Sequence, residues 1–275
     1  SGSFINPRKW GLPHHILNPI HKAYFCSKNE IGIKKCIAYI IDRKKLLTFL
    51  ETKSRSNKNL KIAYDSEIKK IDYGKKGINY LIYSKDRISK KVSAKIFVDC
   101  SGLSAVLGRK IGITPSKAIL ALGVEYLVPL KKEQHTADLF VGSNLPGGYG
   151  WIFPKNSKTA IVGYGTLSKK YFSKAEKYLR YMWKIKRVSE RCDLKPLEKN
   201  IGILRTGKPL NKFVEKNLVI IGDSAVQSNP LVGEGIRFVM DSSKIASKWI
   251  RLSIKNNNLN LLENYCSEWK KRYYN

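Results

Sequence analysis

The sequence has few acidic residues and no long apolar run. Its 275 residues contain 21 Asp and Glu against 52 Lys and Arg, a formal net charge of +31. No apolar stretch approaches the roughly 20 residues of a membrane-spanning helix. The first residues also lack the charged and apolar regions of a secretory signal. We therefore expect a globular protein, and the 43% hydrophobic content is sufficient for a core.

Cysteine and histidine are also scarce, and neither shows a metal-binding spacing. There is no C-x-x-C or H-x-x-x-H pair, so a zinc site or disulfide framework is not expected. Five scattered cysteines are typical of a protein of the reducing cytoplasm. The residues concerned are Cys26, Cys36, Cys100, Cys192, Cys266, His14, His15, His21 and His135.

The positive charge favours anionic partners, which include phosphate-bearing cofactors, acidic lipid head groups and nucleic acid. The lysines are spread singly or in short pairs, and no tract matches a nucleic-acid-binding motif. We expect no specific nucleic-acid partner. Two interpretations stay open: contact with an anionic membrane surface or substrate, and a general compositional bias toward Lys, Ile, Asn and Tyr.

The most informative stretch lies near the C-terminus. The apolar run 218–221, closed by Gly222 and Asp223, predicts a buried strand that ends in a tight turn. Gly233 and Gly235 then open an amphipathic helix. Such a turn can hold a polar ligand, because a carboxylate accepts hydrogen bonds and a helix N-terminus offers free N–H groups with partial positive charge.

Residues 222–236, which read G-D-S-A-x-x-x-N-P-x-x-G-E-G-I, resemble the third flavin motif of FAD-dependent oxidoreductases of the aromatic-hydroxylase type. The resemblance is greatest to the geranylgeranyl reductase family. It implies that Asp223 holds the ribityl chain of FAD and that the following turn approaches the isoalloxazine ring. The cofactor-binding residues implied here are Gly222, Asp223, Pro230, Gly233, Glu234, Gly235 and Ile236.

Two other interpretations of this stretch stay open. Asp223 can cap the following helix in a purely structural turn. Alternatively, Ser224 can be the nucleophile of a hydrolase, since the segment is one residue short of the G-x-S-x-G elbow. Val226 stands where that elbow requires glycine.

Two earlier segments carry a similar resemblance. A strand over 35–41 followed by a helix capped by Asp42 resembles the segment in which an Arg touches the flavin, which implies Arg43 as a cofactor ligand. Residues 94–104 resemble the second flavin motif, with Ser101 where many relatives carry Asp. Ser104 stands at a familiar Ser position and is a further implied cofactor residue.

Residues 148–155 resemble the Y-x-W-x-F-P segment of geranylgeranyl reductases, which lies over the flavin and faces an isoprenoid tunnel. Strand alternation places Tyr149, Trp151 and Phe153 on one side, as an aromatic wall suited to a hydrocarbon chain. With Pro154 these are the implied substrate residues. Flavin-dependent halogenases carry W-x-W-x-I-P here, so we favour the reductase. An ordinary aromatic core strand is the remaining alternative.

The predicted fold is mixed α/β: a Rossmann-like FAD-binding domain with an inserted antiparallel substrate sheet. We expect a partial FAD-binding domain with a small β-meander over 1–115, the substrate domain with a basic helix over 116–200, and the return of the FAD-binding domain over 201–275. Residues 1–30 are predicted to be mostly loop, 60–64 a short strand and 168–190 one amphipathic helix. The family's opening G-x-G-x-x-G turn is missing, which favours a fragment of a longer protein.

The resulting hypothesis is an FAD-dependent reductase that saturates C=C bonds of geranylgeranyl chains on a prenyl lipid or diphosphate. The electron donor is open between NAD(P)H and a ferredoxin-type protein. We expect a cytoplasmic location, with peripheral contact to the inner face of the membrane. The alternatives are a flavin-dependent monooxygenase or halogenase and a non-catalytic, basic, membrane-associated fragment. No residue identifies itself as the proton donor.

Overall fold

The computed structural model describes residues 2–3, 10–230 and 232–273. The chain forms two compact units, one from residues 1–58 and 120–203, the other from 59–119 and 204–275. Each unit therefore combines two separate stretches of sequence. The division into FAD-binding and substrate domains remains a prediction. The boundaries of the compact units differ from the predicted domain boundaries.

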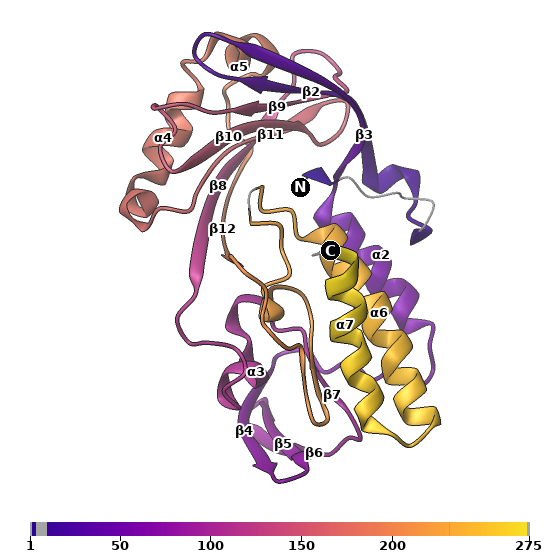
Figure 1. Cartoon of the computed structure of the whole chain (residues 1–275). Helices are drawn as coiled ribbons and strands as arrows, with labels where there is room; N and C mark the ends of the chain where they lie inside the picture. The colour runs from indigo at the N-terminus through magenta and orange to yellow at the C-terminus, as the bar shows by residue number, and fades with distance from the viewer. Residues whose placement is uncertain (1, 4–9, 231, 274–275) are drawn as a thin grey trace. The chain divides into compact units, whose positions relative to one another are not determined.

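The first unit is built on an eight-stranded sheet in the order β1-β3-β2-β9-β10-β11-β8-β12 (Figure 1). All pairs along β9, β10, β11 and β8 are antiparallel, whereas β2 runs parallel to β9. The strands are β1 (Gly2–Ser3), β2 (Leu17–Cys26), β3 (Ile31–Ile41), β8 (Ile119–Pro129), β9 (Thr136–Phe140), β10 (Gly148–Pro154), β11 (Thr159–Thr166) and β12 (Glu198–Thr206). The predicted antiparallel strands over 118–165 are thus confirmed.

The prediction of a loop over most of residues 1–30 is wrong, because β2 occupies 17–26. Its apolar alternation is interrupted by a bulge between Ile20 and Lys22 and by exposed residues at positions 21 and 22. Pro19 adds to the irregular pattern. Pairing with β3 and β9 nevertheless satisfies the backbone, so tertiary context overrides the weak local signal.

The core of the first unit lies on one face of its sheet. Val124, Ile152, Val162 and Tyr164 are at most 2% exposed and pack with Leu179. Leu179 belongs to helix α4, which covers this face (Figure 1). The residues between them in the strands therefore point to the opposite face.

The prediction of one continuous helix over 168–190 is wrong. The segment consists of η3 (Lys169–Lys174), α4 (Ala175–Met182) and α5 (Lys186–Arg191). Ile185 has an extended backbone, with φ −78° and ψ 118°, which ends the helical run. Ile185 packs against the core and Val188 is fully buried in it, so burial of these side chains favours the break.

The helix predicted after Asp42 is confirmed as α2 (Arg43–Arg55). The Asp42 carboxylate accepts a hydrogen bond from the Lys45 backbone N–H at 3.3 Å, which satisfies one of the unpaired N–H groups of the first turn. A short 3-10 helix, η1 (His14–Ile16), precedes β2.

The second unit contains two three-stranded sheets and the C-terminal helices. One sheet has the order β13-β14-β7, with β14 parallel to β7, and the other is the antiparallel meander β4-β5-β6. The elements are β4 (Ser66–Gly74), β5 (Gly77–Lys85), β6 (Ile88–Val92), β7 (Phe97–Asp99), η2 (Gly102–Ser104), α3 (Val106–Lys110), β13 (Val214–Glu215), β14 (Leu218–Ile220), η4 (Gly222–Ala225), α6 (Ile236–Lys255), η5 (Leu259–Leu262) and α7 (Glu263–Tyr273). The meander agrees with the prediction except at 60–64, which is exposed and forms no strand.

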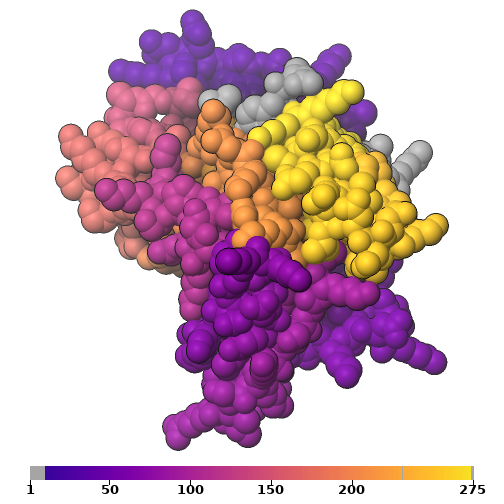
Figure 2. All heavy atoms as spheres, turned by 60° about the horizontal axis from the view of Figure 1, so that its bottom comes forward, coloured from indigo at the N-terminus to yellow at the C-terminus, as the bar shows by residue number. Residues whose placement is uncertain are grey.

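Aromatic packing holds the C-terminal helices of this unit. The rings of Phe213 and Trp269 meet edge-on with centroids 5.2 Å apart, and Phe213 also contacts Tyr265 at 5.6 Å. All three side chains are at most 1% exposed. Helices α6 and α7 lie side by side and form one continuous surface, coloured yellow in Figure 2. Across the described ranges, we find no helix with the length and apolar character needed to cross a bilayer.

Candidate functional site

The Gly-Asp turn of the second unit forms where two parallel strands end together. Ile220 of β14 pairs with Asp99 of β7, so the loops that follow both strands leave the same edge of the sheet. Gly222 begins the short helix η4 with φ +71°, a left-handed conformation that favours glycine. A Cβ at this position would also lie 2.9 Å from Val239 of α6. The turn therefore depends on glycine.

Asp99 joins the two loops, a role that was not predicted from the sequence. Its buried carboxylate accepts hydrogen bonds from the backbone N–H groups of Ser101, Leu107 and Gly108, each at 2.9 Å. The hydroxyl of Ser224, from the other loop, lies 3.3 Å from the same carboxylate. The sequence feature that could have indicated this role is an acidic residue at the end of an apolar strand. Asp99 positions the loop that carries Ser101 and Ser104.

The N-terminus of α6 lies beside Asp223. A Cβ on Gly235, which caps the helix, would lie 3.9 Å from the Asp223 carboxylate, so the absence of a side chain keeps this approach open. Gly233 has φ +65° and is exposed. The structure thus brings together Gly222, Asp223 and Gly235, with Ile236 as the first residue of the 20-residue helix.

Other predicted cofactor residues have more varied surroundings. Glu234 is 8% exposed and forms an ion pair with Arg237 at 3.3 Å, so its carboxylate is turned toward its own helix. Pro230 and Ser104 are exposed. Leu231, which belongs to the same sequence motif, lies outside the described residues. Arg43 is the first residue of α2 in the other unit.

The geometry of Ser224 argues against the hydrolase interpretation. Its side chain is completely buried, and its hydroxyl lies 3.2 Å from the carbonyl oxygen of Gly102. A nucleophilic serine on a strand-to-helix elbow must present its hydroxyl to substrate. Ser224 instead joins two loops.

In the first unit, the predicted aromatic row is present on the face opposite α4. The ring centroids of Tyr149 and Trp151 are 5.6 Å apart, and those of Trp151 and Phe153 are 6.0 Å apart with the rings stacked. Burial raises the pKa of Tyr149 to about 12. Phe153 also packs against the cluster formed by Ile20 and Ile40. The predicted geometry is confirmed, whereas the contact with substrate remains a proposal.

Trp151 lies across glycines of β11, the adjacent strand, and of β8, the strand beyond it. A Cβ on Gly163 would come within 2.2 Å of the indole, and one on Gly165 within 3.2 Å. The far end of the ring is 3.8 Å from a Cβ placed on Gly123. The indole therefore covers β11 and reaches β8. Its buried Nε1–H has no hydrogen-bond partner among the described residues.

Pro154 ends the aromatic strand and is buried. Its carbonyl oxygen accepts a hydrogen bond from Asn18 Nδ2 at 2.8 Å, so this predicted substrate residue anchors β10 to the beginning of β2.

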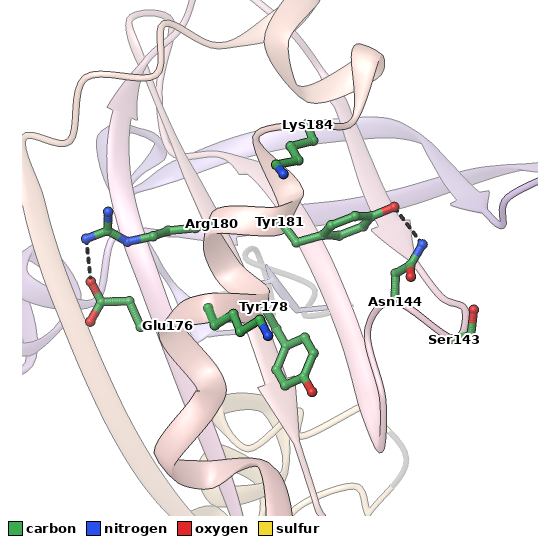
Figure 3. A pocket seen from close by; sticks show the side chains of 8 residues that line it. Ser143, Asn144, Glu176, Tyr178, Arg180, Tyr181 and Lys184 are labelled. Atoms are coloured by element: carbon green, nitrogen blue, oxygen red, sulfur yellow. Dashed lines mark hydrogen bonds and ion pairs between the residues drawn. The ribbon is translucent and has the colours of Figure 1, made fainter.

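A surface pocket of about 620 Å³ lies elsewhere in the first unit (Figure 3). Arg180 pairs with Glu176 at 3.1 Å across its rim, and Tyr181 accepts a hydrogen bond from Asn144 at 2.6 Å (Figure 3). The pocket is lined by Ser143, Asn144, Glu176, Lys177, Tyr178, Arg180, Tyr181 and Lys184. Because α4 covers the sheet face opposite the aromatic row, the pocket is separate from the candidate site. Within the described parts of the chain, we find no group of His, Cys, Asp and Glu arranged to hold a metal.

Comparison with known proteins confirms the resemblance that the motifs indicate. Residues 121–204 match the family model described as geranylgeranyl reductase catalytic domain. The chain is 30% identical over 247 residues to a digeranylgeranylglycerophospholipid reductase of Methanococcus aeolicus, covering 87% of this chain and 62% of that protein. It therefore spans less than two thirds of that relative.

Solved structures show that the fold is that of flavoproteins. A geranylgeranyl bacteriochlorophyll reductase-like protein of Thermoplasma acidophilum superposes with a TM-score of 0.85 at 18% identity, covering 98% of this chain and 72% of that one. A flavin-dependent brominase gives a TM-score of 0.78 at 13% identity, covering 96% and 71%. Reductases and halogenases thus share this architecture, and their different functions depend on individual residues.

Proposed function

We propose, from the similarity of this chain to geranylgeranyl reductases, that it forms part of an FAD-dependent reductase that saturates C=C bonds of geranylgeranyl chains on a prenyl lipid. The observation that carries this proposal is the aromatic row on β10, which lies inside the segment matching the reductase catalytic domain. Its rings form a continuous apolar layer, of the kind against which a substrate chain without polar groups can pack. Tyr149 and Phe153 replace the outer Trp and the Ile of the halogenase motif, which favours the reductase.

The Gly-Asp turn fits a flavin. Asp223 can accept hydrogen bonds from the ribityl hydroxyls, and Gly235 leaves the approach to its carboxylate free of a side chain. The first N–H groups of α6 have no partner within the helix and carry partial positive charge, which suits the electron-rich edge of the ring. The sequence motif also implies Arg43, the first residue of α2, as a cofactor ligand.

In this proposal the bound cofactor supplies a hydride equivalent to one alkene carbon. The residues of the chain orient the reactants and exclude water. Trp151 and Phe153 hold the hydrocarbon by apolar contact. Asp223 holds the cofactor by accepting hydrogen bonds from the hydroxyl groups of the ribityl chain. Removal of water from the apolar surface strengthens the polar contacts at its border.

The test compares Asp223→Ala and Trp151→Leu in the complete protein, with dithionite as reductant and a geranylgeranyl lipid as substrate. Loss of charge-assisted hydrogen bonds to Asp223 should weaken FAD binding about 10- to 100-fold. Trp151→Leu should lower turnover more than flavin content. The exposed variant Glu190→Gln on α5 is the control. Full flavin retention by Asp223→Ala refutes the ribityl assignment, and a colourless, inactive wild-type protein favours the non-catalytic alternative.

We also infer that the protein works at an anionic membrane surface through the tip of the β2–β3 hairpin, residues 25–34. This tip exposes Phe25 by 48%, Ile31 by 55% and Ile33 by 62%. Lys28 and Lys34 are exposed beside them, and Glu30 is the one acidic residue of the tip. Exposed apolar side chains among lysines match the apolar interior and anionic head groups of a bilayer.

A further inference from the structure

Glu125 occupies the same sheet face as the aromatic row. In the registers of β8, β11 and β10, Glu125 lies opposite Gly163, and Gly163 lies opposite Trp151. Directly opposed residues of antiparallel strands point to the same face. The carboxyl group and the indole are therefore two strands apart, with a residue that has no side chain between them.

The indole ring of Trp151 extends from β10 across β11 toward the strand that carries Glu125. Since Trp151 covers Gly163 and reaches Gly123, two residues before Glu125 on the same strand, the acid stands at the border of the apolar surface. Along β8 to β11, all within the described residues, the other acidic side chain is Asp138. Asp138 is fully buried on the α4 face and pairs with Arg187 at 2.6 Å. Glu125 is thus the one acid of these strands that can meet a chain lying on the aromatic row.

The surroundings of Glu125 favour its protonated form. Burial raises its pKa, and Glu198 of β12 acts in the same direction, whereas Arg43 of α2 and Lys155, after β10, act against it. A carboxylic acid whose pKa is raised beside an apolar surface is better suited to general acid catalysis than an ordinary carboxylic acid. The two cations can also stabilise the carboxylate after the proton has left.

We propose that Glu125 is the acid that protonates the alkene, an inference that rests on the proposed reductase function. As the π bond breaks, one carbon forms a C–H bond with the hydride equivalent from the reduced cofactor. The neighbouring carbon forms a C–H bond with the proton of the Glu125 carboxyl group. The alkene gains two hydrogens, the cofactor is oxidised, and the carboxylate recovers a proton from water.

The experiment compares wild type, Glu125→Gln, Glu125→Asp and the control Glu190→Gln as complete proteins. Turnover with dithionite and a geranylgeranyl lipid should fall about 10²- to 10⁴-fold in Glu125→Gln, with flavin content unchanged. Glu125→Asp keeps the acid and should recover part of the rate. The wild-type rate should fall as pH rises through the pKa of Glu125, because the acid must be protonated, and Glu125→Gln should lose this dependence.

A second measurement needs neither flavin nor substrate. In protein labelled with ¹³C at the glutamate carboxyl carbons, the signal absent from Glu125→Gln should titrate above the ordinary value of 4.5. An ordinary titration, or wild-type turnover in Glu125→Gln, refutes the inference and leaves the reductase proposal standing. If wild type holds reduced flavin and still leaves every prenyl chain unsaturated, the proposed function itself is wrong. If Glu125→Gln does not fold, the Glu125 signal is assigned from its absence in Glu125→Asp, whose aspartate carries no glutamate label. The titration and the rate of Glu125→Asp then test the inference.

Discussion

Trp151 owes its position to glycines on β11, the strand beside it, and on β8, the strand after that. Its indole lies flat across β11, where any side chain at position 163 would overlap it. A large aromatic ring and small neighbouring residues must therefore occur together. This dependence is invisible in the β10 sequence and appears only when the strand register is known.

Gly163→Ala should destabilise the protein by about 1–3 kcal/mol through overpacking, because the added Cβ would lie 2.2 Å from the indole. The control is Gly202→Ala on β12, where no atom lies within 4 Å of the added Cβ. Urea unfolding followed by tryptophan fluorescence measures both. Equal stability of the two variants would show that the indole moves aside without loss.

At the scale of elements, α4 is joined to the sheet by a charged cluster around Glu176. Its carboxylate accepts hydrogen bonds from Tyr126 at 2.8 Å and Arg180 at 3.1 Å, and it pairs with Lys199. These donors, with Lys199 first, lower the pKa of Glu176 to about 2. The carboxylate is therefore ionised over the whole neutral and mildly acidic range.

The lowered pKa gives the pH dependence a definite sign. The stabilisation by ionised Glu176 is present above its ordinary pKa of 4.5 and is lost as pH falls toward about 2. Glu176→Gln should lower the melting temperature at neutral pH and flatten its decline across this window. Scanning calorimetry at several pH values measures this, with Glu67→Gln on β4 as control. A variant that keeps the wild-type acid profile would contradict the assignment.

The sequence predicted these elements unevenly, for physical reasons. Alternation identified β8, β10 and β11 because each has one face in the core, and Asp42 identified the start of α2. Strand β2 escaped because its bulge breaks the alternation. The role of Asp99 escaped because it depends on how the following loop folds back and on Ser224 of a distant loop. The role of Glu125 escaped because it depends on the register with β11 and β10. Local pattern cannot reveal a role that depends on register.

At the scale of the whole molecule, the net charge of +31 and the apolar hairpin tip should act together. The protein should sediment with phosphatidylglycerol vesicles at low salt and dissociate from them at high salt. It should not sediment with phosphatidylcholine vesicles. Ile33→Ser should weaken binding about tenfold, because an exposed apolar anchor is lost.

The matched control for vesicle binding is Ile201→Ser on β12, where Ile201 is 64% exposed, close to the 62% of Ile33. Equal losses in both variants would point to unspecific apolar contact. If Ile33→Ser binds vesicles as well as the wild type, with the same salt dependence, charge alone accounts for the binding. The hairpin tip is then not the membrane contact.

The interleaved order of the two units has a consequence for how the chain reaches its native state. Strand β2 finds its partner β9 only after the ribosome has made the whole intervening stretch. Contacts between distant residues slow folding, because loop closure must precede them. During synthesis, the open edge of the β2–β3 hairpin is exposed to other nascent chains. The first unit therefore cannot close until the chain has been made as far as residue 203.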